Sequence, residues 1–375
     1  MNLAARNNCK VLIAAGGTGG HVFPALAVCE ALNAKNVSVI WVGTAVGLES
    51  RVVPDAGIPM HLIDVIGWRG KNLLHRLKAP FLMLAAVFSV VAMLRCEKIT
   101  VVLGLGGFVS AAAGFAAFVS RKPLLLQEQN AVMGTANRCL SPFAKRIFAG
   151  FSSITSAGSK RVFTGNPLRS SFISKTNELN RLPPSSEQQL KILVVGGSLG
   201  ARPLNELLPQ SIAEFASSLG EGWSLQVLHQ SGAAESEIVS SRYEKIVGSM
   251  PQVEVTVCPF IDDMASEMSC AHLMIARSGA LSVSEALSMG LPTIFVPLPH
   301  AIDDHQTANA KEPVASGAAA LLPQSEINAK ILAAAISDCV LNSKTWTAMS
   351  REAFSLAKTD AAEVIANACL EYTNA

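Results

Sequence analysis

The sequence predicts an α/β protein made of two Rossmann-like domains with parallel sheets. A strand, a glycine-rich loop and a helix follow one another from residue 10, and the same unit returns at residue 191. Apolar runs of strand length alternate with helical patterns, as expected for parallel sheets joined by crossover helices. The 375 residues, half of them hydrophobic, exceed what one domain of ordinary size contains.

We expect four segments along the chain. Residues 1–165 form the first domain, 166–190 a linker, 191–345 the second domain, and 346–375 a C-terminal helix that packs back on the first domain. The linker is predicted because Pro183-Pro184 lies in a polar stretch without helical or strand periodicity.

The first strand is the apolar run Lys10–Ala15, which the loop Gly16–His21 joins to a helix at about 22–33. Pro24 then falls in the first helical turn, where a missing N–H costs nothing. The glycines indicate either a ligand close to the backbone or simple packing of strand against helix. His21 is either a surface or capping residue or, beside such a loop, a general base.

The first domain continues with a second glycine turn, Gly104–Gly107, which leads into a helix of small residues. Polar residues Gln127–Ala131 end a buried strand, and such strands end in the ligand crevice of α/β proteins. This edge is therefore a candidate site. Strands are expected at 37–43, 100–103, 123–127, 146–149 and 161–164.

A long helix is expected at 72–95, and its 16 residues 79–94 carry no charge. That stretch is shorter than the roughly 20 residues that span a bilayer, and it contains Pro80. A core helix, a membrane-surface helix and a true span stay open as alternatives. We favour a helix partly buried and partly facing anionic lipid, because basic residues flank it. These are Arg69, Lys71, Arg76, Lys78, Arg95 and Lys98.

The second domain opens with the strand 191–195 and the loop Gly196–Ala201. Later strands are expected at 224–228, 253–257, 273–276 and 293–299, and closing helices at about 326–340 and 344–373. Within this domain, the turn Arg277–Ala280 joins a buried strand to a short helix, Leu281–Met289. A diphosphate fits such a turn, because N–H groups and the positive end of the helix dipole converge there.

Glu285 has two possible roles one helical turn further on. Its carboxylate could accept hydrogen bonds from a ribose while phosphates bind the N–H groups. Alternatively, Ser282–Glu285 fits a capping box, in which Glu285 satisfies only backbone donors.

Charge and cysteine content narrow the function class. Charged residues make up 15% and the net charge is +2, which argues against disorder and against nucleic acid as a partner. Residues 1–165 nevertheless hold 17 Lys+Arg and 6 Asp+Glu, so this half suits lipid or a phosphorylated substrate. The eight cysteines form no C-x-x-C pair, and residues 1–9 do not resemble a signal peptide. We expect a cytoplasmic protein.

Nine stretches resemble the bacterial cell-wall N-acetylglucosaminyltransferases that convert lipid I to lipid II, the MurG family. They recur in the family's order over about 10–310. The resemblance implies a GT-B fold, with the two parallel sheets facing each other across a cleft. The stretches are Gly16–Pro24, Leu103–Ser110, Glu128–Asn130, Gly165–Arg169, Gly196–Arg202, His229–Gly232, Phe260–Met264, Arg277–Glu285 and Asp304–Asn309.

The resemblance also implies site residues. The donor UDP-GlcNAc would be held mainly by the second domain and the lipid acceptor by the first. Thr18, Gly19 and Gly20 would lie at the cleft, and Asn130 would lie at its sugar-facing edge. Arg169 and Ser198 would contact the donor, Ile261 its uracil, and Gln306 its sugar hydroxyls. The phosphate and ribose would bind to Ala280, Leu281, Ser282, Val283, Ser284 and Glu285. Leu199 stands where the family often has Gln, and the family varies around 300–304.

The expected chemistry is an inverting displacement without a cofactor. The muramyl C4 hydroxyl would attack the anomeric carbon, His21 would take its proton, and helix N-termini would stabilise the leaving UDP. No metal is expected, because no Asp-x-Asp clamp occurs. The alternatives are a UDP-GlcNAc 2-epimerase of the same fold and a non-catalytic membrane scaffold. A nicotinamide dehydrogenase is disfavoured, because residues 17–22 break the G-x-G-x-x-G spacing.

The expected partners are UDP-GlcNAc, lipid I, an anionic membrane surface and other cell-wall synthesis proteins. The expected location is the cytoplasmic face of the bacterial inner membrane, with peripheral attachment.

Overall fold

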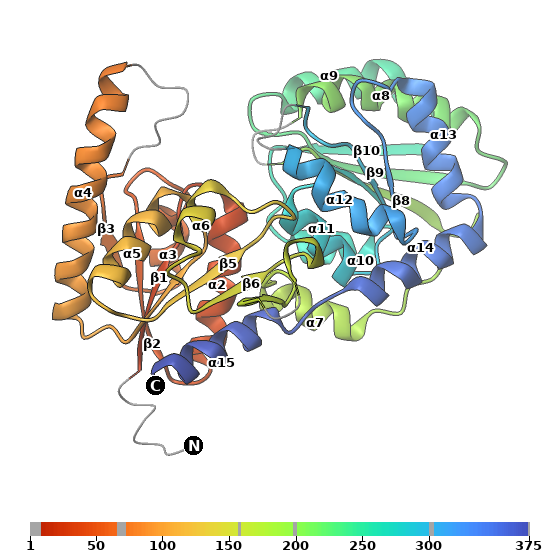
Figure 1. The fold of residues 1–375 in the computed structure, drawn as a ribbon. Helices are drawn as coiled ribbons and strands as arrows, with labels where there is room; N and C mark the ends of the chain where they lie inside the picture. Colours follow the sequence, from red (N-terminus) through yellow and green to blue (C-terminus); the bar gives the residue numbers. More distant parts are fainter. Residues whose placement is uncertain (1–8, 66–72, 157–158, 198–200, 300–303, 374–375) are drawn as a thin grey trace. The chain divides into compact units, whose positions relative to one another are not determined.

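The computed structural model describes residues 9–65, 73–156, 159–197, 201–299 and 304–373, with only the backbone described for 73–77. It divides into two units (Figure 1). Unit 1 comprises Met1–Ser170 and Lys358–Ala375, and unit 2 comprises Ser171–Ala357. The chain thus enters unit 2 before the end of the expected linker and returns to unit 1 for its last segment.

Unit 1 contains a seven-stranded parallel sheet in the order β3-β2-β1-β4-β5-β6-β7. Because β2 and β4 flank β1 on opposite sides, the loops after β1 and β4 diverge at a topological switch point, where α/β proteins bind ligands. The strands are β1 Lys10–Ala14, β2 Ser38–Gly43, β3 Met60–Leu62, β4 Val101–Gly104, β5 Leu124–Glu128, β6 Arg146–Ala149 and β7 Arg161–Phe163.

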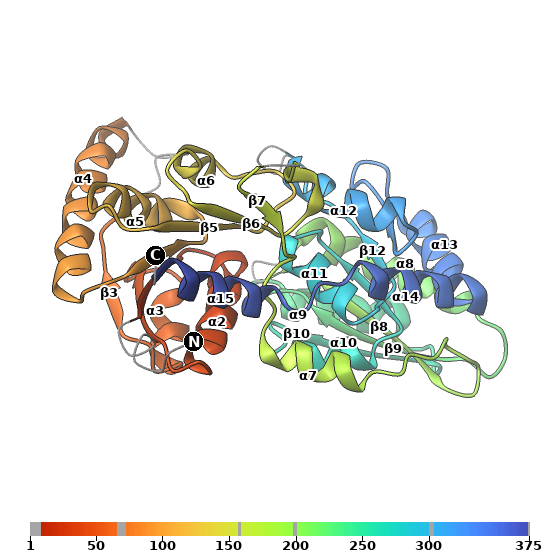
Figure 2. The same cartoon turned by 60° about the horizontal axis from the view of Figure 1, so that its bottom comes forward.

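Helices cover both faces of this sheet. One face packs against α2 (Gly19–Asn33), α3 (Glu49–Asp55) and α15 (Ala361–Thr373). Figure 2 shows α15 lying along α2, and residues of both helices share one core. The other face packs against α4 (Leu73–Cys96), α5 (Gly107–Val119) and α6 (Thr135–Leu140).

Unit 2 repeats the arrangement with a six-stranded parallel sheet in the order β10-β9-β8-β11-β12-β13. Its switch point lies between β8 and β11. The strands are β8 Gln189–Val195, β9 Ser224–Gln230, β10 Val253–Cys258, β11 Leu273–Ala276, β12 Thr293–Phe295 and β13 Ala319–Leu321. The helices are α7 Ser170–Glu178, α8 Arg202–Ser217, α9 Ser236–Val247, α10 Met264–Cys270, α11 Ala280–Ser288, α12 His305–Ala315, α13 Ala329–Val340 and α14 Ser343–Leu356.

Two expectations about helices were wrong. The helix after the first glycine loop begins at Gly19, so Pro24 lies in its second turn rather than its first. The expected closing helix 344–373 is two helices, α14 and α15, separated at 357–360 and belonging to different units. The segment 166–190 is also not a plain linker, because it includes α7, whose Phe172 is fully buried.

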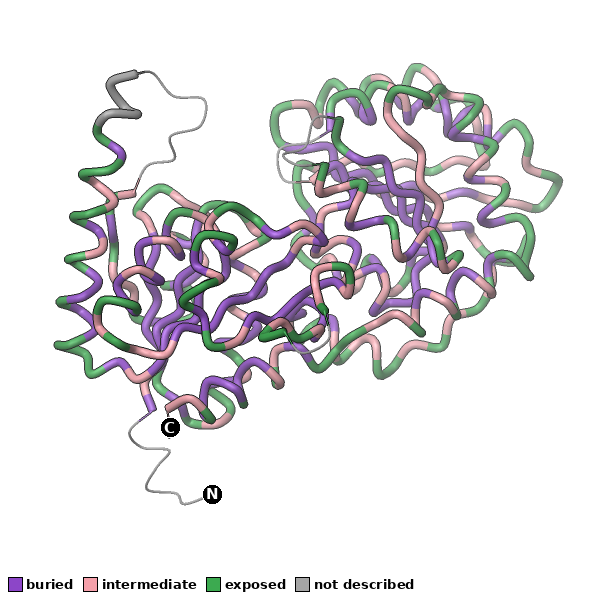
Figure 3. The backbone as a smooth tube through the Cα atoms, viewed as in Figure 1, coloured by how far each residue is buried: buried purple, intermediate pink, exposed green. Residues whose placement is uncertain are grey.

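Helix α4 is half buried (Figure 3). Ala86, Val90 and Leu94 pack in the core with α5, whereas Phe81, Leu84 and Phe88 are 76%, 55% and 63% exposed. The exposed positions recur every three or four residues and therefore share one helix face. By length and composition alone, Lys78–Cys96 could cross a membrane, with a mean hydropathy of 2.0, and a third of it is buried.

Candidate active site

The site residues of unit 1 lie where β1 and β4 end. Thr18 is the N-cap of α2, and His21 is in its first turn. Gly106 follows β4 with a φ of 98°, a conformation that favours glycine. A Cβ at Gly106 would lie 3.0 Å from Nε2 of His21, so the missing side chain leaves room for the imidazole. The switch point therefore places a histidine beside two glycine turns.

His21 is held as a neutral imidazole. Burial lowers its pKa from the usual 6.5, while the carboxylates of Glu128 and Glu49 and the Gly16 carbonyl act in the opposite direction. Nδ1 is shielded from solvent and has no partner of ordinary hydrogen-bond geometry among the residues described. A neutral histidine near pH 7 is able to accept a proton.

The carboxyl end of β5 carries a buried polar network. The carboxylate of Glu128 accepts hydrogen bonds from the backbone N–H of Asn130 (3.1 Å), the N–H of Gly134 (2.9 Å) and the amide of Asn137 (2.9 Å). Asn130, which the resemblance places at the sugar-facing edge, is thus held by Glu128. The anion also faces His21 and favours its protonated form.

Arg169 ends unit 1. Its guanidinium lies over the ring of Phe23 on α2, 4.8 Å from the centroid, which is the geometry of a cation–π contact. The structure therefore orients Arg169 against the same helix that carries His21.

In unit 2 the capping-box interpretation of Glu285 is wrong. Helix α11 begins at Ala280 with Gly279 as its N-cap, so Ser282 lies inside the first turn and cannot be the cap. Gly279 has no side chain to satisfy the N–H groups of that turn, which in any α-helix lack intrahelical acceptors. Glu285 is half buried in the second turn. This is the geometry expected for a helix start that binds an anion.

Arg277 supports this turn instead of facing a ligand. Its guanidinium donates to the carbonyls of Val296 (2.9 Å) and Pro297 (3.0 Å) and to Gln324 (2.7 Å). Asn309 donates to the carbonyl of Ser278 at 3.1 Å. The turn before α11 is therefore fixed from both sides.

Two predicted donor-site residues have part of their hydrogen-bonding capacity in use. The N–H of Ile261 donates to Oε1 of Gln230 at 3.0 Å, so any contact with a base would come from its side chain or carbonyl. Oε1 of Gln306 accepts from the N–H of Leu298 at 2.8 Å. Its NH2 group is the part suited to donate to a sugar hydroxyl.

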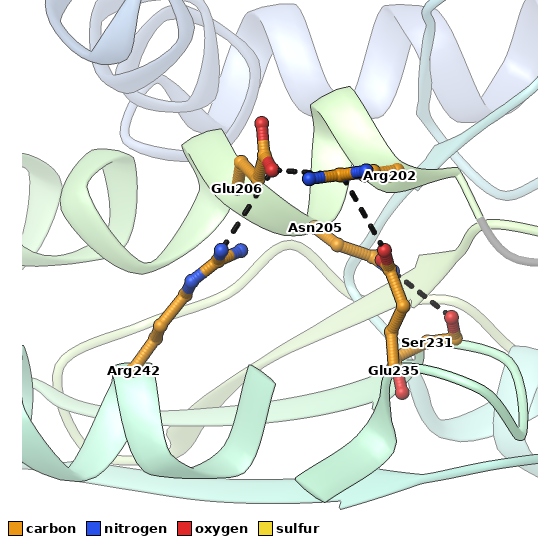
Figure 4. Close-up of polar contacts among 6 residues, drawn as sticks. All are labelled: Arg202, Asn205, Glu206, Ser231, Glu235 and Arg242. Atoms are coloured by element: carbon orange, nitrogen blue, oxygen red, sulfur yellow. Dashed lines mark hydrogen bonds and ion pairs between the residues drawn. The ribbon is translucent and has the colours of Figure 1, made fainter. Parts of the chain in front are cut away.

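A histidine at the end of β9 organises the backbone near these residues. His229 Nε2 lies 3.1 Å from Oδ1 of Asn205, whose amide group donates to the carbonyl of Ser231 (2.9 Å) and to Glu235 (2.7 Å) (Figure 4). Because the Asn205 amide donates, its oxygen must accept from His229. His229 Nδ1 then accepts from the Tyr243 hydroxyl at 3.2 Å. Burial lowers the pKa of His229 to about 3, so this chain stays neutral.

The structure brings together two sets of predicted residues, one in each unit. In unit 1 these residues follow the carboxyl ends of strands or lie in the turn Gly165–Arg169; they are Thr18, Gly19, Gly20, His21, Asn130 and Arg169. In unit 2 they are Ile261, Ala280, Leu281, Ser282, Val283, Ser284, Glu285 and Gln306. Ser198 and Leu199 lie outside the described residues, and His305 is the first residue of α12.

Sequence reasoning missed Glu49 and Arg181. Glu49 is a fully buried carboxylate beneath the first glycine loop. Arg181, which falls in the expected linker, donates to the carbonyls of Met268, Ala271 and Met289. Glu49 had a weak signal, namely an acid that closely follows Gly43 and Gly47 in a basic half of the chain. Arg181 had none, because carbonyl partners leave no sequence pattern.

Comparison with known proteins agrees with this geometry. Residues 11–149 match the glycosyltransferase family 28 N-terminal domain and residues 191–365 the family 28 C-terminal domain. A UDP-N-acetylglucosamine–N-acetylmuramyl-(pentapeptide) pyrophosphoryl-undecaprenol N-acetylglucosamine transferase from Pseudomonas paraeruginosa is 45% identical over 362 residues, 96% of this chain and 98% of that protein.

Solved structures show the same fold. The crystal structure of MurG from Acinetobacter baumannii has a TM-score of 0.79 and 36% identity, covering 97% of this chain and 99% of that chain. A UDP-GlcNAc 2-epimerase from Neisseria meningitidis bound to UDP-GlcNAc has a TM-score of 0.69 but 16% identity, over 96% and 100% of the chains, and shares the fold alone.

Two parallel sheets of Rossmann order, each with helices on both faces and a glycine loop at its switch point, define a glycosyltransferase of the GT-B fold. The chain belongs to glycosyltransferase family 28, and within it to the MurG family of N-acetylglucosamine transferases.

Proposed function

We propose that this protein transfers N-acetylglucosamine from UDP-GlcNAc to the C4 hydroxyl of the muramyl sugar of lipid I, giving lipid II for peptidoglycan synthesis. The observation that carries the proposal is 45% identity, over nearly the full length, to transferases named for this reaction. Other cell-wall synthesis proteins that use the product are candidate partners.

The donor is assigned mainly to unit 2. The start of α11 would provide N–H groups and a dipole for the diphosphate, and Glu285, in the second turn, would accept hydrogen bonds from the ribose. Ile261 would meet the uracil, Gln306 a sugar hydroxyl and Arg169 the donor, as the resemblance implies. Because the Arg277 guanidinium donates to the Val296 and Pro297 carbonyls and to Gln324, we assign stabilisation of the leaving diphosphate to fixed helix N–H groups rather than to that guanidinium.

The acceptor is assigned to unit 1, with His21 as the base. His21 takes the proton of the attacking hydroxyl, whose oxygen forms the new bond to the anomeric carbon. The bond from that carbon to the diphosphate oxygen breaks, its electron pair leaves with UDP, and configuration at the carbon inverts. The neutral state of His21 supports this role.

The test is a transfer assay with radiolabelled UDP-GlcNAc and a short-chain lipid I analogue, with and without EDTA. We expect labelled disaccharide product, with turnover unchanged by EDTA, because the sequence offers no Asp-x-Asp clamp. Loss of UDP-GlcNAc without acceptor would show an epimerase instead. Donor binding without turnover would show a non-catalytic protein, and loss of turnover in EDTA would contradict dipole stabilisation alone.

We also propose that unit 1 binds the cytoplasmic face of the inner membrane through the exposed face of α4. What supports this is the apolar row Phe81, Leu84 and Phe88, with Lys78, Arg95 and Lys98 exposed beside it. The opposite face of the helix lies in the core. A span would expose that face to lipid and empty the core, so attachment at the surface costs less.

The membrane proposal is tested by flotation with phosphatidylglycerol–phosphatidylcholine vesicles. Changing Phe81, Leu84 and Phe88 together to Ser should weaken binding by about 10-fold or more, because each side chain loses apolar burial. Binding by the unchanged protein should fall with added salt. The matched control replaces exposed Ile238, Ile331 and Leu341 of unit 2 by Ser. Equal binding by both triple variants would refute the assignment to α4.

A further inference from the structure

A pocket built from glycines encloses the carboxylate of Glu49. The side chain is 0% exposed, and a Cβ would lie 2.6 Å from Oε1 at Gly16, 2.7 Å from Cγ at Gly43 and 2.0 Å from Oε2 at Gly47. Contacts this short do not occur between real atoms, so any larger residue at these glycines would displace the carboxylate. Two loops, one after β1 and one after β2, thus leave room for one anion.

Among the residues that the structure describes, the polar neighbours of this anion are hydrogen-bond donors, and no cation pairs with it. Oε2 accepts from the N–H of Gly17 at 2.9 Å, and Oε1 accepts from the N–H (3.0 Å) and hydroxyl (2.8 Å) of Thr44. Burial raises the pKa of Glu49, but these hydrogen bonds outweigh it, and the net pKa lies below the usual value. Glu49 is therefore ionised at neutral pH, and its charge is not cancelled by an ion pair.

The peptide between Gly16 and Gly17 connects this anion to His21. Its N–H donates to Glu49, and its carbonyl oxygen is the Gly16 acceptor that raises the pKa of His21. A Cβ at Gly107 would stand 3.6 Å from that oxygen and 4.0 Å from Nδ1. The other ring nitrogen, Nε2, faces Gly106. The Glu49 carboxylate, the Gly16–Gly17 peptide and the His21 imidazole are therefore neighbours in that order.

We propose that Glu49 is a positioning residue for the transfer reaction, acting on His21 through the Gly16–Gly17 peptide. The carboxylate holds the peptide so that its carbonyl accepts the Nδ1 proton of His21, which leaves the lone pair of Nε2 toward the acceptor hydroxyl. When Nε2 takes the proton, the negative charge of Glu49 stabilises the resulting imidazolium through the polarised peptide. This inference rests on the proposed role of His21 as the base.

Glu49 also accepts the hydrogen bond of the Gly17 N–H, which is then not available to bind a phosphate. The first glycine loop is therefore anionic underneath and suits a neutral sugar hydroxyl beside His21.

The experiment compares Glu49→Gln with the unchanged protein by ¹⁵N-histidine NMR and by kinetics. His21→Gln identifies the His21 signals among the seven histidines. Glu128 and Glu49 are the carboxylates that face His21, so removing one charge should lower its pKa. In the unchanged protein we expect His21 to carry its proton on Nδ1. In Glu49→Gln we expect a lower His21 pKa and a kcat reduced about 10-fold. That loss is smaller than the ~100-fold or larger loss expected when the base itself is removed.

Controls separate this effect from general disruption. Glu97→Gln removes an exposed unit 1 carboxylate paired with Lys10 and should change neither titration nor kcat. UDP binding should be the same in all variants, because the donor is assigned to unit 2. If Glu49→Gln does not fold, Glu49→Asp, which withdraws the carboxylate from Gly17, should give the same direction of change.

An unchanged His21 pKa and tautomer in a folded Glu49 variant would overturn the inference, whatever the activity. Turnover retained by His21→Gln would overturn the proposed base instead. The two failures are therefore distinguishable.

Discussion

His21 shows how burial prepares a side chain for proton transfer. Its ring lies between two glycine turns, where desolvation disfavours the charged form and two carboxylates partly offset that effect. Burial also lowers the pKa of His229, to about 3, and the ring of His229 contacts Asn205 and Tyr243. The two histidines differ in their neighbours, because Nε2 of His21 faces a glycine while both ring nitrogens of His229 are hydrogen-bonded.

The lowered pKa of His21 predicts the pH profile of transfer. The base must be neutral, so kcat/KM should stay level as pH falls through 6.5 and decline only below that value. Since the unfolded chain binds the proton more readily, the free energy of unfolding should also decrease as pH falls below 6.5. Initial rates across the pH range with the lipid I analogue test this. A half-maximal point at or above 6.5 would contradict it.

Helix α11 depends on contacts at both ends. Its first turn has no side-chain cap, because Gly279 is the N-cap. At its other end, the Thr176 hydroxyl lies 3.1 Å from the Ser288 carbonyl, and Arg181 donates to the Met289 carbonyl. A cation at a helix C-terminus also stabilises the helix dipole. The segment expected as a linker thus fixes the helix proposed to bind the diphosphate.

Removing the Arg181 guanidinium should destabilise unit 2. Arg181→Met keeps the apolar stem but leaves three carbonyls without their donor, at a cost of about 3 kcal/mol. Burial lowers the pKa of Arg181 to about 10, so it remains charged at neutral pH and the loss should not depend on pH there. Urea unfolding followed by hydrogen-exchange mass spectrometry resolves unit 2 from unit 1.

The control for Arg181→Met is Arg351→Met, which removes an exposed ion pair with Glu352 on α14. Exposed pairs contribute about 0.2–1 kcal/mol, so this variant should unfold near the unchanged midpoint. If both arginine variants lowered the midpoint equally, the carbonyl contacts of Arg181 would not be the cause.

At the scale of the molecule, the two sheets have the same strand order but different chemistry at their switch points. Unit 1 presents a histidine and carboxylates, and unit 2 presents a helix start and backbone N–H groups. Each unit has its own core, so a ligand of one unit stabilises mainly that unit.

UDP alone should therefore protect unit 2 from hydrogen exchange. We expect slower exchange in the first turn of α11 and around Ile261, and no change in Gly16–His21. The turn Gly165–Arg169 is the exception in unit 1, because Arg169 is assigned a donor contact. Adenosine diphosphate at the same concentration controls for recognition of the base. Protection confined to unit 1 would refute the donor assignment.

The sequence by itself determined the two-domain α/β fold, the two glycine loops, the family and the positions of the strands other than the short β3 and β13. These follow from local periodicity and from short motifs, which need no knowledge of distant partners. His21, Asn130, Arg169 and Glu285 could be named from such motifs, although their contacts with donor and acceptor stay predictions.

Only the tertiary structure decided what surrounds these residues. Gly17 and Glu49 are 32 residues apart in sequence, and Arg181 lies 87 to 108 residues from its carbonyl partners. Such pairs meet because the strand order folds the chain back, and a carbonyl or N–H partner has no side-chain signature. The start of α11 was likewise set by Gly279 and the strand before it, which overrode the local capping pattern at Ser282–Glu285.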